Sequence, residues 1–300
     1  MDSDKFYSRI VLAGIIILMG MYYLSVKEHK RRNFNPAAYF DNSYQSKHFT
    51  FYYNKKIQVV PEFAAFADAF VPFIKNHYFE TDIVDPLDFY VLSDREEFRS
   101  FIRQELDGIP SDGGEYVYDL RALITHEEAD IGTVAYIVMQ PLMAGRFRSA
   151  PPWFVMGLAS FFEMIYVYED DGQLVLNVGY HSPIRTQELM NRGGIAGIKL
   201  SDIVTKPVDQ LTKNEVRLVI LFLHKRGKLR AYLEQLKENT LDGYNSYLEA
   251  SFRKELSEIE FYWRHFIVEY DRKKLVIVDN PRSQVFESKE LFDSISASFY

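Results

Sequence analysis

The residues whose types and spacing come closest to a chemical site form the run His126–Asp130, which reads HEEAD. On a helix, residues four positions apart share one face. A histidine, an adjacent glutamate and a third ligand at that spacing would supply two metal ligands and a general base, and a carboxylate such as that of Asp130 can bind zinc. The same run also fits a helix start, where acidic residues are favoured, with Thr125 as N-cap and Glu128 completing a capping box.

Other polar candidates stand alone in the sequence. His181 lies in the loop-like segment GYHSP and would face either a cleft or the solvent. Neither Ser160 nor Ser182 sits in a GxSxG elbow, so a serine nucleophile is not indicated. The chain contains no cysteine, which excludes disulfides, cysteine zinc sites and cysteine nucleophiles. The candidate catalytic residues are therefore His126, Asp130 and His181.

The composition indicates a folded protein that does not bind nucleic acid. Of the 300 residues, 47% are hydrophobic and 26% are charged, which predicts a globular chain with one large or two small cores. The net charge is −7 and the body of the chain has no dominant basic block, whereas phosphate binding needs clustered lysine and arginine. We therefore expect no nucleic-acid partner.

Two consecutive helices, joined by a short basic loop, are expected over residues 132–163. Apolar residues recur at helical spacing from Ile131 to Leu142, which gives the first helix one apolar face. Proline is preferred at the first helical position, so Pro152 favours the start of a second helix that runs towards Tyr166. The loop 146–148 (RFR) would contact anionic lipid, a partner or only solvent.

A pattern of aromatic and small residues marks the second helix: Trp153, Gly157, Leu158, Ala159, Phe161, Phe162 and Glu163. It resembles the second zinc helix of gluzincin-type metallopeptidases, especially the peptidase MA-like and DUF1570-like domains. Those families carry an HExxH helix, a short loop, and then Trp-x-x-Glu-Gly-Leu-Ala followed by aromatic residues and glutamate. The closing Ile-Glu-x-x-Trp pattern, with Glu260 and Trp263, is also similar, and the resemblance covers residues 47–268. It implies structural roles for Trp153, Gly157 and Glu163.

The resemblance does not extend to the metal ligands. The HExxH positions fall on Tyr136, Ile137 and Gln140, and the third-ligand glutamate falls on Met156. A catalytic zinc needs three protein ligands and an open water position, and Ile137 cannot act as a general base. Pro141 removes a backbone donor and would kink the helix. The resemblance therefore implies a fold without zinc or another cofactor, in which the phenol, amide and thioether converge inside the helix pair.

Together with the resemblance, the remaining pattern predicts an α+β fold: a zincin-like domain with a small N-terminal mixed sheet and a helical C-terminal half. Strand-like alternation covers 47–54, and 88–92 reads as a short buried strand. Helical periodicity covers 61–79, and Ser93 with Glu96 begins a helix that runs to 106. Segment 113–124 reads as a loop followed by an edge strand, which in zincins lies along the substrate cleft and can pair with an extended peptide. Further helices are expected at 183–192, 214–225, 229–237, 244–252 and 257–266, and strands at 174–178 and 275–278.

The N-terminal segment Ile10–Val26 contains no charge and has basic residues on both sides. About 17 apolar residues is the lower limit for crossing a bilayer. No cleavage pattern follows, so an uncleaved transmembrane helix is indicated, with a buried core helix as the alternative. The expected organisation is a tail (1–9), an anchor (10–26), a linker (27–46), a degenerate peptidase MA-like domain (47–268) and a C-terminal extension (269–300).

The orientation of this anchor is open on the sequence alone. The stronger basic flank, Lys27 to Arg32, follows the span, and by the positive-inside rule it leaves the body cytoplasmic. The family resemblance implies an exported domain. We favour a single-pass membrane protein whose body lies on the extracytoplasmic side.

Two function classes fit these observations. The first is a membrane-anchored pseudopeptidase, in which the cleft of the family persists without its metal and binds a protein or peptide or scaffolds a complex. The second is a hydrolase of the peptidase MA-like type with a non-standard site that uses His126, Asp130 or His181. The phenol, amide and thioether at the ligand positions favour the first class.

Deletion of residues 1–32 is expected to release the body of the protein from membranes. Each leucine-like residue near the centre of a span contributes about −0.5 kcal/mol to insertion, and the segment Ile10–Val26 has no charge to oppose it. Ultracentrifugation of membranes from cells that produce the full-length or the truncated chain measures the effect, with a carbonate wash to remove peripheral proteins. A truncated chain that stays in the washed pellet would show that the anchor lies elsewhere.

Overall fold

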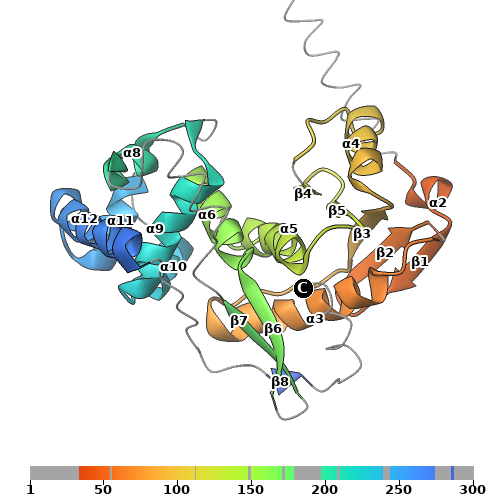
Figure 1. Cartoon of the computed structure of the whole chain (residues 1–300), viewed down its shortest axis with the longest axis horizontal. Helices are drawn as coiled ribbons and strands as arrows, with labels where there is room; N and C mark the ends of the chain where they lie inside the picture. Colours follow the sequence, from red (N-terminus) through yellow and green to blue (C-terminus); the bar gives the residue numbers. More distant parts are fainter. Residues whose placement is uncertain are drawn as a thin grey trace, which may run out of the picture.

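The computed structural model describes residues 34–54, 56–111, 113–147, 150–170, 173–178, 197–207, 210–238, 244–273 and 285–286. The expected anchor 10–26, the helix expected at 183–192, His181 and the strand expected at 275–278 lie outside these residues. Within the described ranges, no helix is both long and apolar enough to cross a membrane. The described chain is α+β, with the large sheet in its N-terminal half and mostly helices in its C-terminal half (Figure 1).

A mixed sheet of five strands forms the N-terminal half. Its strands are β1 (Asn42–Gln45), β2 (Phe49–Tyr53), β3 (Leu87–Leu92), β4 (Gly114–Val117) and β5 (Ala122–His126). In space they follow the order β1-β2-β3-β5-β4. The strands β2, β3 and β5 are parallel, while β1 and β4 run antiparallel to their neighbours. The expected small mixed sheet is therefore confirmed.

Alternating side chains give the sheet two apolar faces. The helices of this half are α2 (Pro36–Tyr39), α3 (Val60–His77) and α4 (Arg95–Gln104). Phe49, Phe51 and Phe89 belong to the main core with the buried face of α3, and the rings of Phe51 and Phe89 stack with centroids 4.6 Å apart. Tyr90 lies on the other face in a smaller core, where Phe98 of α4 also packs. Helices on both faces shield the central parallel strands.

The helix pair α5 (Ile131–Ala144) and α6 (Pro152–Phe162) connects the sheet to the C-terminal half. A small antiparallel sheet follows, made of β6 (Ile165–Asp170), β7 (Gln173–Val178) and β8 (Val285–Phe286). The further described helices are α8 (Leu200–Thr205), α9 (Lys213–Lys225), α10 (Leu229–Glu238), α11 (Tyr244–Phe252) and α12 (Leu256–Lys273). Figure 1 shows α5 and α6 between the sheet-containing half and this helical group.

Several local expectations differ from the structure. Segment 113–124 forms a hairpin in which the edge strand β4 comes first and the inner strand β5 second. The helix α6 ends at Phe162, because β6 begins at Ile165 and pairs with β7, so the expected continuation towards Tyr166 is wrong. The helix α2 and the strand β1 lie in the segment expected to be a linker.

The cap of α4 is shifted by one residue from its expected position. Asp94 is the N-cap, and its carboxylate accepts hydrogen bonds from the amides of Glu96 (2.9 Å) and Glu97 (2.8 Å). Glu97, rather than Glu96, reaches back to accept a hydrogen bond from the amide of Ser93 at 2.8 Å. The aspartate prevails because it satisfies two amides of the first turn at once.

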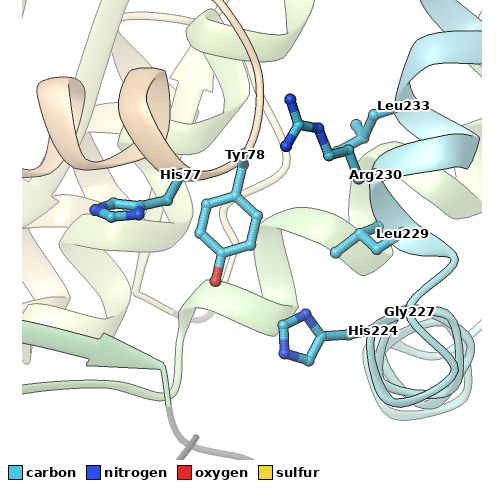
Figure 2. A pocket seen from close by; sticks show the side chains of 7 residues that line it. All are labelled: His77, Tyr78, His224, Gly227, Leu229, Arg230 and Leu233. Carbon is cyan, nitrogen blue, oxygen red and sulfur yellow. The ribbon is translucent and has the colours of Figure 1, made fainter. Parts of the chain in front are cut away.

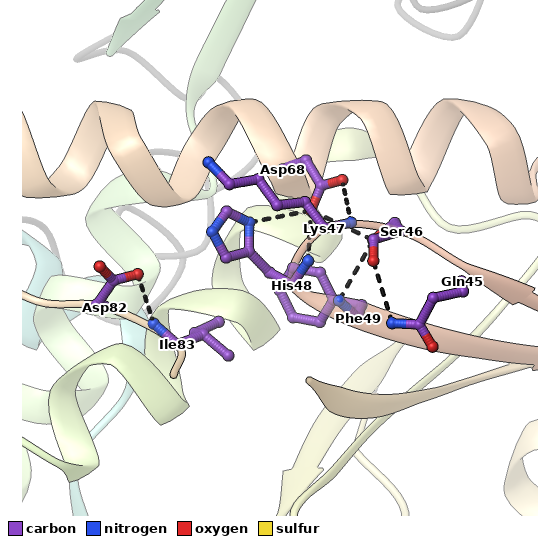
Figure 3. Close-up of polar contacts among 8 residues, drawn as sticks. All are labelled: Gln45, Ser46, Lys47, His48, Phe49, Asp68, Asp82 and Ile83. Atoms are coloured by element: carbon purple, nitrogen blue, oxygen red, sulfur yellow. Dashed lines mark hydrogen bonds and ion pairs between the residues drawn. The ribbon is translucent and has the colours of Figure 1, made fainter. Parts of the chain in front are cut away.

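One carboxylate fastens the β1–β2 hairpin to α3 (Figure 3). Asp68 accepts hydrogen bonds from the backbone amides of Lys47 (2.9 Å) and His48 (3.0 Å) and from the hydroxyl of Ser46 (3.2 Å). Nδ1 of His48 lies 3.0 Å from the same carboxylate. Hydrogen bonds to an ionised acceptor are stronger than neutral ones. This contact therefore fixes the amino end of β2 against the middle of α3.

The backbone approaches α6 closely on two sides. A Cβ atom on Gly132 of α5 would lie 2.2 Å from the carbonyl oxygen of Glu163, which ends α6. A Cβ atom on Gly157 of α6 would lie 2.7 Å from the carbonyl oxygen of Val216 in α9. Both distances are shorter than a van der Waals contact, so neither position accommodates a side chain. The start of α5 therefore lies against the end of α6, and the two helices run antiparallel.

The substitution Gly132→Ala is expected to lower the free energy of unfolding by about 1–3 kcal/mol, because the added methyl group meets backbone that must shift. Gly145→Ala is the matched control: a Cβ atom there meets nothing within 4 Å, and φ is −72°, which any residue adopts. We expect the control to keep or slightly raise the stability. Urea denaturation followed by tryptophan fluorescence measures both, and equal stability of the two variants would contradict the close contact.

Candidate functional site

The run His126–Asp130 does not form a helical ligand set, so this expectation is wrong. His126 is the last residue of β5, and α5 begins only at Ile131, with Asp130 as its N-cap. The Asp130 carboxylate accepts a hydrogen bond from the amide of Thr133 at 2.7 Å. Residues 126 and 130 therefore lie at a strand end and in a helix cap rather than on one helical face.

The polar groups beside His126 hold backbone in place. The Thr125 hydroxyl donates to the carbonyl of Gly113 at 2.7 Å, which joins β5 to the residue before β4. The Glu127 carboxylate accepts a hydrogen bond from the amide of Gln58 at 3.1 Å. The expected capping box between Thr125 and Glu128 is wrong, because Thr125 is a buried residue of β5.

His126 itself is buried, with 2% of its surface exposed. Neither ring nitrogen has a hydrogen-bond partner among the described residues, and the ring packs near Phe98 with centroids 5.8 Å apart. Burial lowers the pKa of His126, and the positive charge of Arg95 is the next cause of the decrease. The imidazole is therefore neutral at pH 7 and lies within the protein rather than on an open cleft.

The degenerate ligand positions lie at the edge of the core. Tyr136 and Gln140 form a partly exposed stripe on α5 with Thr133, whereas Ile137 is fully buried. Spacings of three and four residues place the stripe on one helical face. Met156 on α6 is also partly exposed. The three side chains lie at the rim of the main core because their apolar neighbours take the buried positions, and their convergence between the two helices stays a prediction.

Lys213 joins the helix pair to α9. Its Nζ atom lies 3.9 Å from the centre of the Tyr136 ring and 3.2 Å from Oε1 of Glu163. The Ser160 hydroxyl donates a hydrogen bond to the other carboxylate oxygen of Glu163 at 3.2 Å. One ammonium group is thus held between a phenol ring from α5 and a carboxylate at the end of α6, directly beside the first degenerate ligand position.

The start of α9 fixes Lys213. Thr212 is the N-cap, and it forms a capping box in which the Glu215 amide donates to Thr212 Oγ1 at 3.2 Å and the Thr212 amide donates to Glu215 at 3.0 Å. Lys213 is therefore the first helical residue. Its role was not predictable from the sequence, because its contact partners lie far along the chain. The Thr-Lys-Asn-Glu pattern signals a helix start but not these contacts.

The motif residues of α6 are built into its packing. Trp153 is 2% exposed, and its ring lies 5.7 Å from that of Phe154 and 5.8 Å from that of Tyr232. Gly157 admits the backbone of α9, and Glu163 binds Lys213. These contacts give all three motif positions a structural task.

The edge strand β4 begins against α5. A Cβ atom on Gly114 would lie 3.0 Å from a methyl group of Ile137 and 3.2 Å from that of Thr133. Within the described residues, β4 pairs only with β5, so its other backbone edge is not part of the sheet. An extended segment can add to such an edge by main-chain hydrogen bonds. This edge lies next to the partly exposed stripe of α5.

No group of three or more histidine, aspartate or glutamate side chains in the described ranges is arranged to hold a metal ion. Two cavities, of about 200 and 260 Å³, are lined by neither Tyr136, Gln140 nor Met156. His181 lies outside the described residues.

Comparisons with known proteins assign no family to the chain. No protein-family model matches it, and no curated protein matches its sequence. The likeness to gluzincin-type metallopeptidases therefore rests on the residue pattern of the helix pair and on the order of the elements around it.

Acidification is expected to destabilise the protein through His126. Its pKa is lowered in the folded state. In the unfolded chain the same histidine has an ordinary pKa near 6.5, so the unfolded state takes up the proton first as the pH falls. The stabilising effect of the neutral imidazole is complete above pH 6.5 and is lost as the pH falls towards the folded-state pKa. His126→Phe is expected to reduce the loss of unfolding free energy between pH 7 and pH 5.

The exposed His265 supplies the control for this measurement. Urea denaturation at a series of pH values compares wild type, His126→Phe and His265→Gln, and the control is expected to keep the acid-induced loss. A His126→Phe chain with the same pH dependence as wild type would show that the buried imidazole does not titrate on unfolding.

Proposed function

We propose that the chain is a membrane-anchored, metallopeptidase-like protein without catalytic activity, which binds an extended peptide segment of a partner protein. The observation that carries the proposal is the helix pair, whose ligand positions hold Tyr136, Gln140 and Met156 while Lys213 places an ammonium group beside Tyr136. Residues 10–26 form the anchor, and the body lies on the extracytoplasmic side, as the family resemblance implies.

The order of the elements supports a zincin-like fold. A mixed sheet with an antiparallel edge strand precedes the helix that carries the degenerate motif. A second helix then returns against the first, with Gly132 in contact with Glu163. This is the order that the resemblance implies, with α5 and α6 in the places of the two zinc helices.

The chemistry of the ligand positions argues against a catalytic metal. A phenol has an ordinary pKa near 10 and is mostly protonated at neutral pH. An amide oxygen is uncharged, and a thioether suits soft ions such as Cu(I) rather than zinc. Ile137 is apolar and fully buried, so no general base stands at the position that would activate a water molecule.

Lys213 gives an electrostatic reason against a bound metal ion. A divalent cation bound between α5 and α6 would lie close to the ammonium group, and like charges repel strongly at such distances. The lysine cannot move away without cost, because it is held by the carboxylate of Glu163 and by the ring of Tyr136. The protein thus keeps a fixed positive charge where a metallopeptidase would hold its metal.

The peptide-binding part of the proposal rests on β4. Within the described residues the sheet ends at β4, so its outer edge would supply main-chain hydrogen bonds, and Tyr116 and Val117 are partly exposed along it. The stripe of Thr133, Tyr136 and Gln140 adds polar groups that contact side chains without cleaving the backbone. A hydrolase with a non-standard site is less well supported, because His126 is buried and Asp130 caps α5.

The purified full-length chain is expected to contain no stoichiometric zinc and to show no chelator-sensitive cleavage of unfolded casein. A water molecule on zinc reaches a pKa of about 7 only in a complete ligand set, which the aligned positions do not provide. Elemental analysis and a protease assay with and without chelator test this. One zinc ion per chain, with activity that the chelator abolishes, would overturn the proposal.

A restored site provides the positive control. The variant Tyr136→His, Ile137→Glu, Gln140→His, Met156→Glu rebuilds the family ligands, and α5 continues through Pro141 to Ala144, so position 140 stays helical. We expect weak zinc binding by this variant and tighter binding when Lys213→Ala is added. Lys213→Arg keeps the charge and is expected to give no gain. Competition with a chromophoric chelator measures the affinities.

A further inference from the structure

Two adjoining cavities lie between the end of α3, the residues after α5, and α10. The smaller, of about 200 Å³, is lined by His77 and Tyr78 on one side and by residues of α9 and α10 on the other (Figure 2). The larger, of about 260 Å³, shares His77, Tyr78, Arg230 and Leu233 with it. Because they share these residues, the two cavities are adjacent, and together they are called the α3–α10 groove below.

The larger cavity is predominantly cationic. Its charged lining residues are Lys75, Arg146, Arg230, Lys237, Glu80 and Glu234. Lys75 and Arg146 are paired with carboxylates at 2.8 and 3.9 Å. Arg230 and Lys237 are exposed and make no ion pair within the described part of the chain. They are seven residues apart on α10, hence on the same face. The groove therefore presents two cations that are available to a ligand.

The smaller cavity is predominantly apolar. Leu229 of α10 faces the ring of Tyr78 across it (Figure 2), and Leu233 of the same helix also lines it. Burial lowers the pKa of His77, so its imidazole is neutral at pH 7 and adds hydrogen-bonding capacity without charge. An apolar cavity of about 150 Å³ is large enough to bind benzene. The space beside Tyr78 therefore suits one aromatic ring or a short alkyl chain.

We propose that the α3–α10 groove binds a small organic anion: a phosphate or carboxylate group carried on a single ring or a short alkyl chain. The head lies in the larger cavity with Arg230 and Lys237, and the apolar body lies in the smaller cavity against Leu229 and Leu233. Arg230 lines both cavities, so this residue lies where head and body join. This site is separate from the helix pair and does not depend on the proposed function.

The charge pattern distinguishes this ligand from others. Glu80 and Glu234 line the same cavity, and such interspersed carboxylates disfavour a polyanion, which needs an uninterrupted basic track. A guanidinium binds a single carboxylate or phosphate through two parallel hydrogen bonds. A bare inorganic anion would leave the apolar cavity unused. One compact anionic head with an apolar body satisfies both parts of the groove.

Calorimetric titration of the full-length chain in lipid nanodiscs with phenyl phosphate tests the proposal, with empty nanodiscs as the blank. We expect one ligand per chain. Arg230→Gln and Lys237→Gln are each expected to weaken binding by on the order of tenfold, because each removes a charge-assisted hydrogen bond. Arg230→Lys is expected to retain part of the affinity. Arg264→Gln, an exposed cation on α12, is the charge-matched control and is expected to change nothing.

Three further probes separate the parts of the ligand. Benzoate reports whether a carboxylate replaces the phosphate head, and binding of either head at the same site supports the proposal. Benzyl alcohol lacks the charge and inorganic phosphate lacks the ring, so each is expected to bind at least about tenfold more weakly than phenyl phosphate. Equal affinity for benzyl alcohol or for inorganic phosphate would overturn the proposal. So would the absence of saturable binding of both phenyl phosphate and benzoate, or unchanged affinity in the Arg230→Gln and Lys237→Gln chains.

Discussion

The described structure depends on two places where backbone packs against α6 without an intervening side chain. The carbonyl of Glu163 lies against Gly132 of α5, and Gly157 lies against the carbonyl of Val216 in α9. Close packing of this kind leaves little freedom in the depth and rotation of a helix. With α5 and α9 both set against α6, the sheet-containing half and the helical half are held in one arrangement. The rings of Phe162 and Tyr78, 4.8 Å apart, extend this packing to the end of α3.

The same packing decides which residues of the helix pair reach the surface. Gly132 of α5 faces the end of α6, and Ile137 of α5 faces β4. The stripe through Tyr136 and Gln140 lies between these two contacts, at the rim of the core. The position of α9 against Gly157 then brings its first residue, Lys213, over the Tyr136 ring. The cation is thus placed by distant backbone contacts, and the polar surface of the helix pair follows from how its apolar side is packed.

Regular elements were predictable where a face is buried with a constant period. Alternation in 47–54 identified β2, the short apolar run 88–92 identified β3, and the helical period identified α3. The start of α5 was predicted too early because Thr125 and Glu128 satisfy a local capping pattern. In the structure Thr125 belongs to β5, which pairs with the distant strand β3. The Lys213 contacts and the α3–α10 groove were missed for the same reason. Both bring together residues from separate helices, and no local sequence pattern predicts a contact between distant segments.

The free-energy contributions of the individual contacts show what holds the helix pair together. A structural zinc site contributes on the order of 10–16 kcal/mol to folding in small zinc domains, so a metal there would fasten α5 to α6 by itself. Lys213 links the same helices to α9, but a partly exposed ion pair and a cation–π contact each contribute only about 0.5–1 kcal/mol. The arrangement must therefore be held by the glycine contacts and the apolar core rather than by the polar groups on its surface. It follows that Tyr136, Gln140 and Met156 are free to differ in chemistry without loss of the fold. Their identities therefore bear on the proposed binding role rather than on stability.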